Sequence, residues 1–198
     1  MLNLPISRNQ ALELLKKYNS SEQDFVHYLE SEAVMKELAM HFKLSEDEIN
    51  YWAMLGLLHD VDWGLTKENV ETHLTKMPEI LKKAGFDDEF ISIISSHGYG
   101  YEELPHLTEK KREEKIEHAL AASETITGLI HDYALMRGKK ISDMEAKGLS
   151  KKYKDKAFAA KVDREIIKEI EKIDLNLEKF FEIAIRGIQK IKIEVGLE

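Results

Sequence analysis

The segment SEDEINYWAMLGLLHDVDWG, residues 45–64, indicates the kind of fold to expect. Ser45 and Glu48 have the spacing of a capping box, in which a hydroxyl and a carboxylate satisfy free N–H groups at a helix start. The apolar run from Ile49 to Leu58 follows directly, with helical spacing. The segment therefore predicts a buried helix that ends at a His-Asp pair, with Gly64 permitting a turn after it.

Helical spacing of apolar residues continues over almost the whole chain. The best strand candidate, IKIEV near the C-terminus, is short and continues a helical segment. With boundary errors of ~2–4 residues, the expected helices span residues 8–18, 21–42, 46–60, 67–84, 87–97, 109–136, 142–149, 151–160 and 163–191, and the last of them is expected to be interrupted. We expect an all-α fold and a single domain over residues 1–198, with a core over about 20–136 and a C-terminal helical part over about 138–198.

The composition restricts the chemistry. The chain has 198 residues, 8 histidines and no cysteine, which excludes a disulfide framework, a thiolate zinc site and a cysteine nucleophile. Any metal must be held by histidines and carboxylates. The 29 basic residues against 37 acidic ones give a net charge of −8. That excess argues against nucleic-acid binding, but it permits a small phosphorylated ligand if a metal supplies positive charge.

Neither a membrane span nor a signal peptide is indicated. Every apolar run is shorter than the roughly 20 residues that a spanning helix needs. The start, MLNLPISRNQALELL, lacks a basic region followed by an apolar stretch. We expect a cytoplasmic protein with no membrane partner.

A His-Asp pair occurs twice. Adjacent helix residues point about 100° apart, so both reach one metal most easily where a helix ends and the backbone turns. His59-Asp60 closes an apolar run and precedes VDWG, whereas His131-Asp132 lies inside a continuing helical pattern. We interpret the first pair as metal ligands and the second as structural or surface residues.

Four further residues are candidate ligands. His27 shares its helix face with Val34 and Leu38, within about 20°. His73 and His97 each lie at or near a helix with an apolar face. Glu124 points along a mostly apolar face, where an unpaired carboxylate is unfavourable. The alternative for Glu124 is a hydrogen bond to a nearby threonine. The alternative for His27 is a buried core histidine that hydrogen-bonds to one neighbour and binds no metal.

Together these residues predict a metal centre with one or two divalent ions. Histidine and carboxylate donors without sulfur suit Fe, Mn, Co or Ni, with Mg or Zn also possible. The proposed ligands are His27, His59, Asp60, His73, His97 and Glu124. The other histidines are expected to be ordinary residues: His41 ends a helix, His106 is exposed in a loop, and His118 is solvated.

The ordered set resembles the HD-domain metal-dependent phosphohydrolases, in particular small bacterial and archaeal HD or HDIG-type proteins. The resemblance is carried by LLHDVDW, by AASETITGLI and by LSKKYKDKAFAAKVDRE, so it covers most of the chain. It implies an HD-domain helical bundle with a C-terminal helical extension, a mono- or dinuclear metal centre, and hydrolysis of phosphoester or phosphoanhydride bonds, usually in nucleotides.

By this resemblance, His27 and the pair His59-Asp60 match the family's first ligands, and His73 and His97 match the extra histidines of dinuclear members. Glu124 stands where the family has a closing aspartate. Asp62 and Trp63 replace the glycine and lysine of cyclic-dinucleotide phosphodiesterases, which disfavours that activity. Asp60 is the expected catalytic carboxylate, and for Asp62 both a proton-handling role and a helix cap are open.

The sequence thus predicts a phosphohydrolase that cleaves a phosphomonoester, phosphodiester or phosphoanhydride bond of a nucleotide with a metal-activated water. Dinucleoside polyphosphate hydrolysis and a non-catalytic metal- or nucleotide-binding module are the alternatives, and a helical interaction protein is a weaker third. The run KKYKDK at 151–156 is expected to be a solvated face, although one of its lysines remains open as a phosphate ligand. The apolar residues Phe180, Phe181, Ile185 and Ile188 are open as core or as a homodimer interface.

Overall fold

The computed structural model describes residues 4–198, which form helices joined by turns and contain no strand. This confirms the all-α prediction. The first half contains α1 (Arg8–Tyr18), α2 (Glu22–His41), α3 (Glu46–Leu58), α4 (Trp63–Thr66), η1 (Val70–Thr72), α5 (Met77–Lys83), α6 (Asp88–Ser95) and η2 (Ser96–Gly98). The second half contains α7 (Lys115–Met136), α8 (Ala146–Lys154), α9 (Arg164–Lys168), η3 (Glu169–Ile173) and α10 (Leu177–Lys190), where η denotes a 3₁₀ helix.

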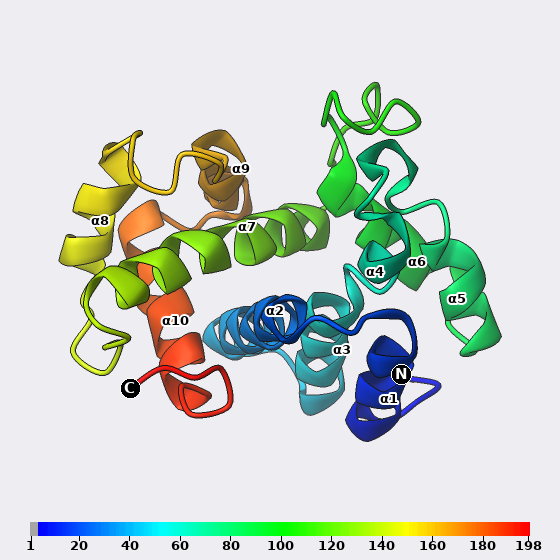
Figure 1. The fold of residues 1–198 in the computed structure, drawn as a ribbon, viewed down its shortest axis with the longest axis horizontal. Helices are drawn as coiled ribbons and strands as arrows, with labels where there is room; N and C mark the ends of the chain where they lie inside the picture. Colours follow the sequence, from blue (N-terminus) through cyan, green and yellow to red (C-terminus); the bar gives the residue numbers. More distant parts are fainter. Residues whose placement is uncertain (1–3) are drawn as a thin grey trace.

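Helices α2 and α7 form the centre of the molecule. Helix α2 packs against α3, α7 and α10, and α7 also contacts α8, α9 and η3. Figure 1 shows α7 running through the middle of the molecule, with α8 and α10 towards one side, α9 beside its middle, and α4, α5 and α6 on the other side. The site described below lies where α2, α3 and α7 meet the group of α4, α5 and α6.

Helix α3 lies very close to α2 because residue 56 is glycine. A Cβ atom at Gly56 would lie 2.5 Å from the carbonyl oxygen of Ser31 in α2. Real Cβ atoms do not approach carbonyl oxygens so closely, so any other residue would push the two helices apart. The capping box predicted at Ser45 and Glu48 is present at the start of α3. Together these features place the end of α3, and hence His59, beside α2.

The apolar face of α10 is part of the core. Phe180, Phe181, Ile185 and Ile188 are all buried, with at most 3% of each exposed. Each such side chain contributes about 1.5–3 kcal/mol when it is removed from water. Of the two roles left open by the sequence, the core role is the one observed. No helix among the described residues is long and apolar enough to cross a membrane.

The helix predicted over residues 67–84 is wrong, because the chain there forms α4, η1 and α5 with turns between them. Leu74 has a left-handed backbone with φ of 66°. The side chain of Asp62 accepts hydrogen bonds from the backbone N–H groups of Lys76 and Met77, both at 3.0 Å, and so stops the preceding turns from continuing as one helix. Pro78 lies in the first turn of α5, where proline is well tolerated.

Two other parts of the helix prediction also differ from the structure. Residues 109–114 precede α7 as non-helical chain, and the predicted helices 142–149 and 151–160 are replaced by the single helix α8. The turns after α8 wrap around Arg164, whose guanidinium donates to the carbonyl oxygens of Phe158, Ala159 and Val162. The interruption expected in the last helix occurs at Asp174, where φ is 65°.

Candidate metal centre

Four histidines and Asp60 come together from separate parts of the chain. His27 lies on α2, His59 and Asp60 directly follow α3, His73 follows η1, and His97 lies in η2. Their ligand atoms form two groups, His27–His59–Asp60 and Asp60–His73–His97, and within each group these atoms lie within 4.8 Å of one another. Asp60 belongs to both.

The first group presents two imidazole nitrogens to one point. His27 Nε2 and His59 Nε2 are 3.0 Å apart, and they lie 3.8 Å and 3.6 Å from Asp60 Oδ2. Two nitrogens that each bind one ion at about 2.0–2.1 Å in adjacent positions are about 3 Å apart. The other ring nitrogens are already bonded: His27 Nδ1 to Thr127 Oγ1 and His59 Nδ1 to the Gly56 carbonyl. The Nε2 atoms are therefore the ones available to a metal.

The second group uses the other oxygen of Asp60. Asp60 Oδ1 lies 3.1 Å from His73 Nε2 and 3.2 Å from His97 Nε2. His97 Nδ1 donates to the Ile94 carbonyl at 2.7 Å, and His73 Nδ1 donates to Asp62 Oδ1 at 3.0 Å. Because the two carboxylate oxygens of Asp60 face different pairs of histidines, the donor set fits two ions bridged by Asp60.

Asp62 is fully buried, and both of its carboxylate oxygens accept hydrogen bonds from N–H groups. It accepts from His73, from the backbone of Leu74 at 3.3 Å, and from the backbone of Lys76 and Met77 at 3.0 Å each. Of the two roles considered for this residue from the sequence, these bonds favour the helix cap. They also give it a function that the sequence did not suggest, which is to orient His73.

Glu124 lies at the edge of the cluster. Its Oε2 is 4.0 Å from His27 Nε2, and its Oε1 accepts a hydrogen bond from the hydroxyl of Thr125 at 2.5 Å. It belongs to neither of the two close groups. Burial raises the pKa of the Glu124 carboxyl, although His97 and His27 act in the opposite direction. The sequence left two roles open for Glu124, metal ligation and a hydrogen bond to a threonine, and the bond to Thr125 is the second of these.

The titratable groups of the cluster have strongly shifted pKa values that differ in direction. Burial lowers the pKa of His59 to about 3, which leaves this ring neutral and able to ligate. Burial would raise the pKa of Asp60, but His59 and His73 hold it well below its usual range. Burial likewise opposes the charged form of His73, yet Asp60 and Asp62 outweigh it and raise the pKa of His73 to about 10.

A pocket of about 390 Å³ opens beside the second group. Besides Asp60, His73, His97 and Glu124, its lining consists of Trp63, Val70, Gly98, Tyr101, Glu103 and Leu104. The described lining includes no lysine or arginine. Sequence reasoning did not identify Tyr101 and Leu104 as part of the site, although both lie in the expected loop that follows His97. The tyrosines of that loop could have indicated that it lines a binding pocket.

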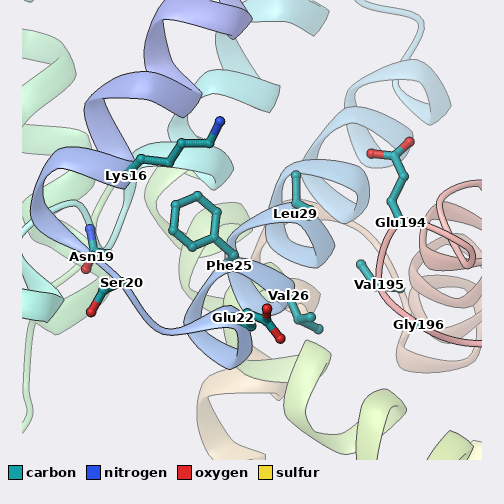
Figure 2. A pocket seen from close by; sticks show the side chains of 10 residues that line it. All are labelled: Lys16, Asn19, Ser20, Glu22, Phe25, Val26, Leu29, Glu194, Val195 and Gly196. Atoms are coloured by element: carbon teal, nitrogen blue, oxygen red, sulfur yellow. The ribbon is translucent and has the colours of Figure 1, made fainter.

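A second pocket, of about 610 Å³, lies between α1, α2 and the turn after α10, as Figure 2 shows. None of its lining residues is a histidine. One of them, Asn19, connects it to the metal centre: its amide donates to the Val61 carbonyl at 3.1 Å and accepts from the Gly64 N–H at 2.6 Å. Asn19 therefore braces the turn that follows Asp60.

The remaining histidines lie outside the cluster. His118 is 5% exposed and its Nδ1 lies 2.5 Å from Glu169 Oε2, so the expectation of a solvated residue is wrong. Its helix face is covered by η3, which packs against α7. His131 Nδ1 lies 2.7 Å from the buried Glu30, His41 ends α2, and His106 is exposed. The lysines at 151, 152, 154 and 156 lie on or just after α8, and none lines the pocket beside the metal ligands.

Comparisons with known proteins agree with this geometry. Residues 24–124, just over half of the chain, match the family described as HD domain. A tRNA (cytidine(56)-2'-O)-methyltransferase from Thermoplasma volcanium is 34% identical over 87 residues, which are 43% of this chain and 24% of that protein. The chain thus spans about a quarter of the length of this relative. No solved structure matches. On the family match and the clustered His-Asp ligands, the chain belongs to the HD-domain family, within the superfamily of metal-dependent phosphohydrolases.

Proposed function

We propose that the protein is a metal-dependent phosphohydrolase that acts on a nucleotide. The observation that carries the proposal is the position of Asp60, whose two oxygens each face a different pair of histidines at 3.1–3.8 Å. A carboxylate shared in this way is suited to hold two ions a few ångströms apart. That arrangement supports hydrolysis of phosphoester and phosphoanhydride bonds better than a single structural ion would.

The ligands would divide between two ions, with His27, His59 and Asp60 around one and Asp60, His73 and His97 around the other. Two ions at this place would neutralise phosphoryl charge and lower the pKa of a bound water. The protein itself would orient the four imidazole rings. It does so through hydrogen bonds from their Nδ1 atoms to Thr127, Gly56, Asp62 and Ile94. Glu124 lies beside the first group as a further candidate ligand, with its Oε2 4.0 Å from His27 Nε2.

The pocket beside the second group would receive the substrate. Trp63, Tyr101 and Leu104 offer an aromatic and apolar wall against which a base can pack, and Glu103 adds an acceptor for hydroxyl or amino groups. With no lysine or arginine in the described lining, the charge of the phosphate would be met mainly by the metals. This favours a substrate with few phosphate groups over a dinucleoside polyphosphate, which is the competing substrate class.

The relative from Thermoplasma is named for a reaction on tRNA, but the chain matches only 24% of it. The net charge of −8 argues against an RNA-binding face on this chain. We therefore propose a small nucleotide as the substrate. The competing function is that of a module that binds a nucleotide without cleaving it.

The test begins with elemental analysis of the purified protein, followed by phosphatase and phosphodiesterase assays on a nucleotide panel with Mn, Fe, Co, Ni and Mg. The wild type should bind metal and release phosphate or nucleoside monophosphate, and Asp60→Ala should lose both properties. His106→Ala is the matched control, because this histidine is exposed and outside the site. A protein without metal, or an Asp60→Ala variant as active as wild type, would refute the proposal. Metal and nucleotide binding without turnover would identify the binding module instead.

A further inference from the structure

Arg112 is a buried arginine that holds the backbone around His97. Its side chain is 5% exposed and lies in the non-helical segment before α7. The Nη1 atom donates to three carbonyl oxygens, those of Ser96 at 2.8 Å, His97 at 3.3 Å and Tyr99 at 2.9 Å. These carbonyls lie in or just after η2, the single 3₁₀ turn that carries His97.

A guanidinium is well suited to this position. The carbonyl groups at the end of a helix lack partners within the helix, and a buried carbonyl without a partner is unfavourable. One cationic donor that serves three of them fixes the turn as a unit and complements the negative end of the helical segment. His97 depends on that turn, because its ring is aligned by the Ile94 carbonyl at 2.7 Å and its Nε2 faces Asp60 Oδ1 at 3.2 Å.

The other side of the guanidinium is held by the C-terminal part of the chain. Arg112 Nε and Nη2 donate to the two carboxylate oxygens of Glu169 in η3, at 2.8 Å and 2.9 Å. This two-pronged pair is the strong and directional form of an arginine–carboxylate contact. Glu169 is fixed in turn by His118 Nδ1 at 2.5 Å, and Lys172 lies 3.7 Å away.

Glu169 lies outside the region that matches the HD domain, residues 24–124, whereas His97 lies inside it. The contact from Glu169 through Arg112 to the His97 turn therefore joins the C-terminal helices to the second metal group. In the first group, the ring nitrogens of His27 and His59 are held instead by Thr127 of α7 and by the Gly56 carbonyl.

We propose that Arg112, anchored by Glu169, is a positioning residue for His97, and that the C-terminal helices thereby set the metal affinity of the Asp60–His73–His97 group. The metal part of this proposal rests on the two-ion centre proposed above. The positioning of the His97 turn is a property of the protein chain itself and is measurable without metal.

The experiment compares wild type with Arg112→Gln and with the milder Glu169→Gln. Metal-free protein is titrated with Mn²⁺ or Co²⁺, and the number and affinity of bound ions are measured. Removing an outer partner of a metal ligand typically weakens binding about 10–100-fold. We expect that weakening for one ion only, the second, with the larger effect in Arg112→Gln and an unchanged first ion in both variants.

Glu37→Gln is the matched control. Glu37 is also a buried carboxylate that pairs with cations from the C-terminal part, in this case Arg186 and Lys190 of α10, but it contacts no turn that carries a ligand. It should lower thermal stability and leave both metal affinities unchanged. A general loss of stability would weaken binding in all three variants alike, so the control separates positioning from stability.

Hydrogen–deuterium exchange of the metal-free proteins gives the second measurement. Exchange should accelerate at residues 96–101 in Arg112→Gln and Glu169→Gln, and should be unchanged there in Glu37→Gln. Unchanged exchange in folded Arg112→Gln, or a second ion bound as tightly as in wild type, would overturn the proposal. If Arg112→Gln does not fold, the same two measurements on Glu169→Gln, exchange at residues 96–101 and affinity for the second ion, test the proposal. If wild-type protein binds no metal, the proposed function fails and the exchange data alone decide the positioning role.

Discussion

Asp62 Oδ1 accepts a hydrogen bond from His73 Nδ1 at 3.0 Å, while Asp62 Oδ2 accepts from the first backbone N–H groups of α5. One buried carboxylate therefore fixes both the orientation of a candidate metal ligand and the start of the helix that follows it. The residue belongs to the sequence HDVDW, two positions after Asp60.

Asp62→Asn should lower both stability and metal affinity. The amide can accept at only one of the two former oxygen positions, and its NH₂ group would face N–H donors at the other. We expect a loss of about 1–3 kcal/mol in the free energy of unfolding and a second ion bound about 10–100-fold more weakly. Denaturant unfolding and metal titration measure the two effects. Asp132→Asn, at the exposed aspartate of the other His-Asp pair, should change neither. Equal metal affinities for Asp62→Asn and wild type would show that His73 needs no such partner.

Asp60 and His73 should differ in the number of ions that depend on them. Asp60 faces both pairs of histidines, whereas His73 belongs to one group only. Asp60→Asn should therefore bind no ion tightly, and His73→Ala should retain one. Elemental analysis after removal of loose metal by a chelator distinguishes these outcomes. A His73→Ala protein that has lost both ions, or an Asp60→Asn protein that keeps both, would contradict the shared role of Asp60.

The sequence predicted those parts of the site that local patterns determine. His27 lies inward because helical periodicity sets its face, and His59-Asp60 end a buried helix because a capping box and an apolar run define that helix. Asp60, His73 and His97 could be gathered into one candidate set from their order along the chain. The distances between them, and the division of Asp60 between two groups, depend on how the helices pack and were not accessible to pattern reasoning.

The errors arose where a distant partner overrides local propensity. Residues 67–84 have helical spacing, but the carboxylate of Asp62 binds the backbone at residues 74, 76 and 77 and divides the segment. His118 follows charged residues and reads as solvated, yet Glu169, 51 positions later, covers it. The contact of Arg112 with Glu169 spans 57 positions. No short window of sequence around His118 or Arg112 contains its partner, and Asp62 lies 12–15 positions before the backbone groups that it binds.

Gly64→Ala should disturb the turn that follows Asp60. A Cβ atom there would lie 2.2 Å from the Tyr18 carbonyl oxygen and 2.8 Å from Asn19 Oδ1, both of which are held in place. We expect a loss of about 1–3 kcal/mol in the free energy of unfolding, the usual range for an overpacked site, together with weaker metal binding. Gly128→Ala in α7 is the control, because its nearest contact is a Val162 methyl group at 3.2 Å. A Gly64→Ala protein as stable as Gly128→Ala would contradict the close packing of α1 against this turn.

The last prediction concerns acid stability. Burial would raise the pKa of Glu169, but the hydrogen bonds from Arg112 and His118 lower it to about 2, from 4.5 for a free glutamate. A carboxyl whose pKa is lower in the folded state stabilises the protein above its unfolded pKa, and this contribution is lost as pH falls through the folded pKa. The contribution of Glu169 should therefore be complete above about pH 5 and decline towards pH 2.

Glu169→Gln cannot make this contribution at any pH. The difference in unfolding free energy between wild type and Glu169→Gln should consequently be largest near neutral pH and should shrink between pH 5 and 2, as measured by urea unfolding at a series of pH values. Glu182→Gln replaces an exposed carboxyl with 47% of its side chain accessible, so its difference from wild type should stay small throughout, since exposed ion pairs contribute little. A difference for Glu169→Gln that is constant down to pH 2 would mean that the carboxylate is not held by Arg112 and His118 in the folded protein.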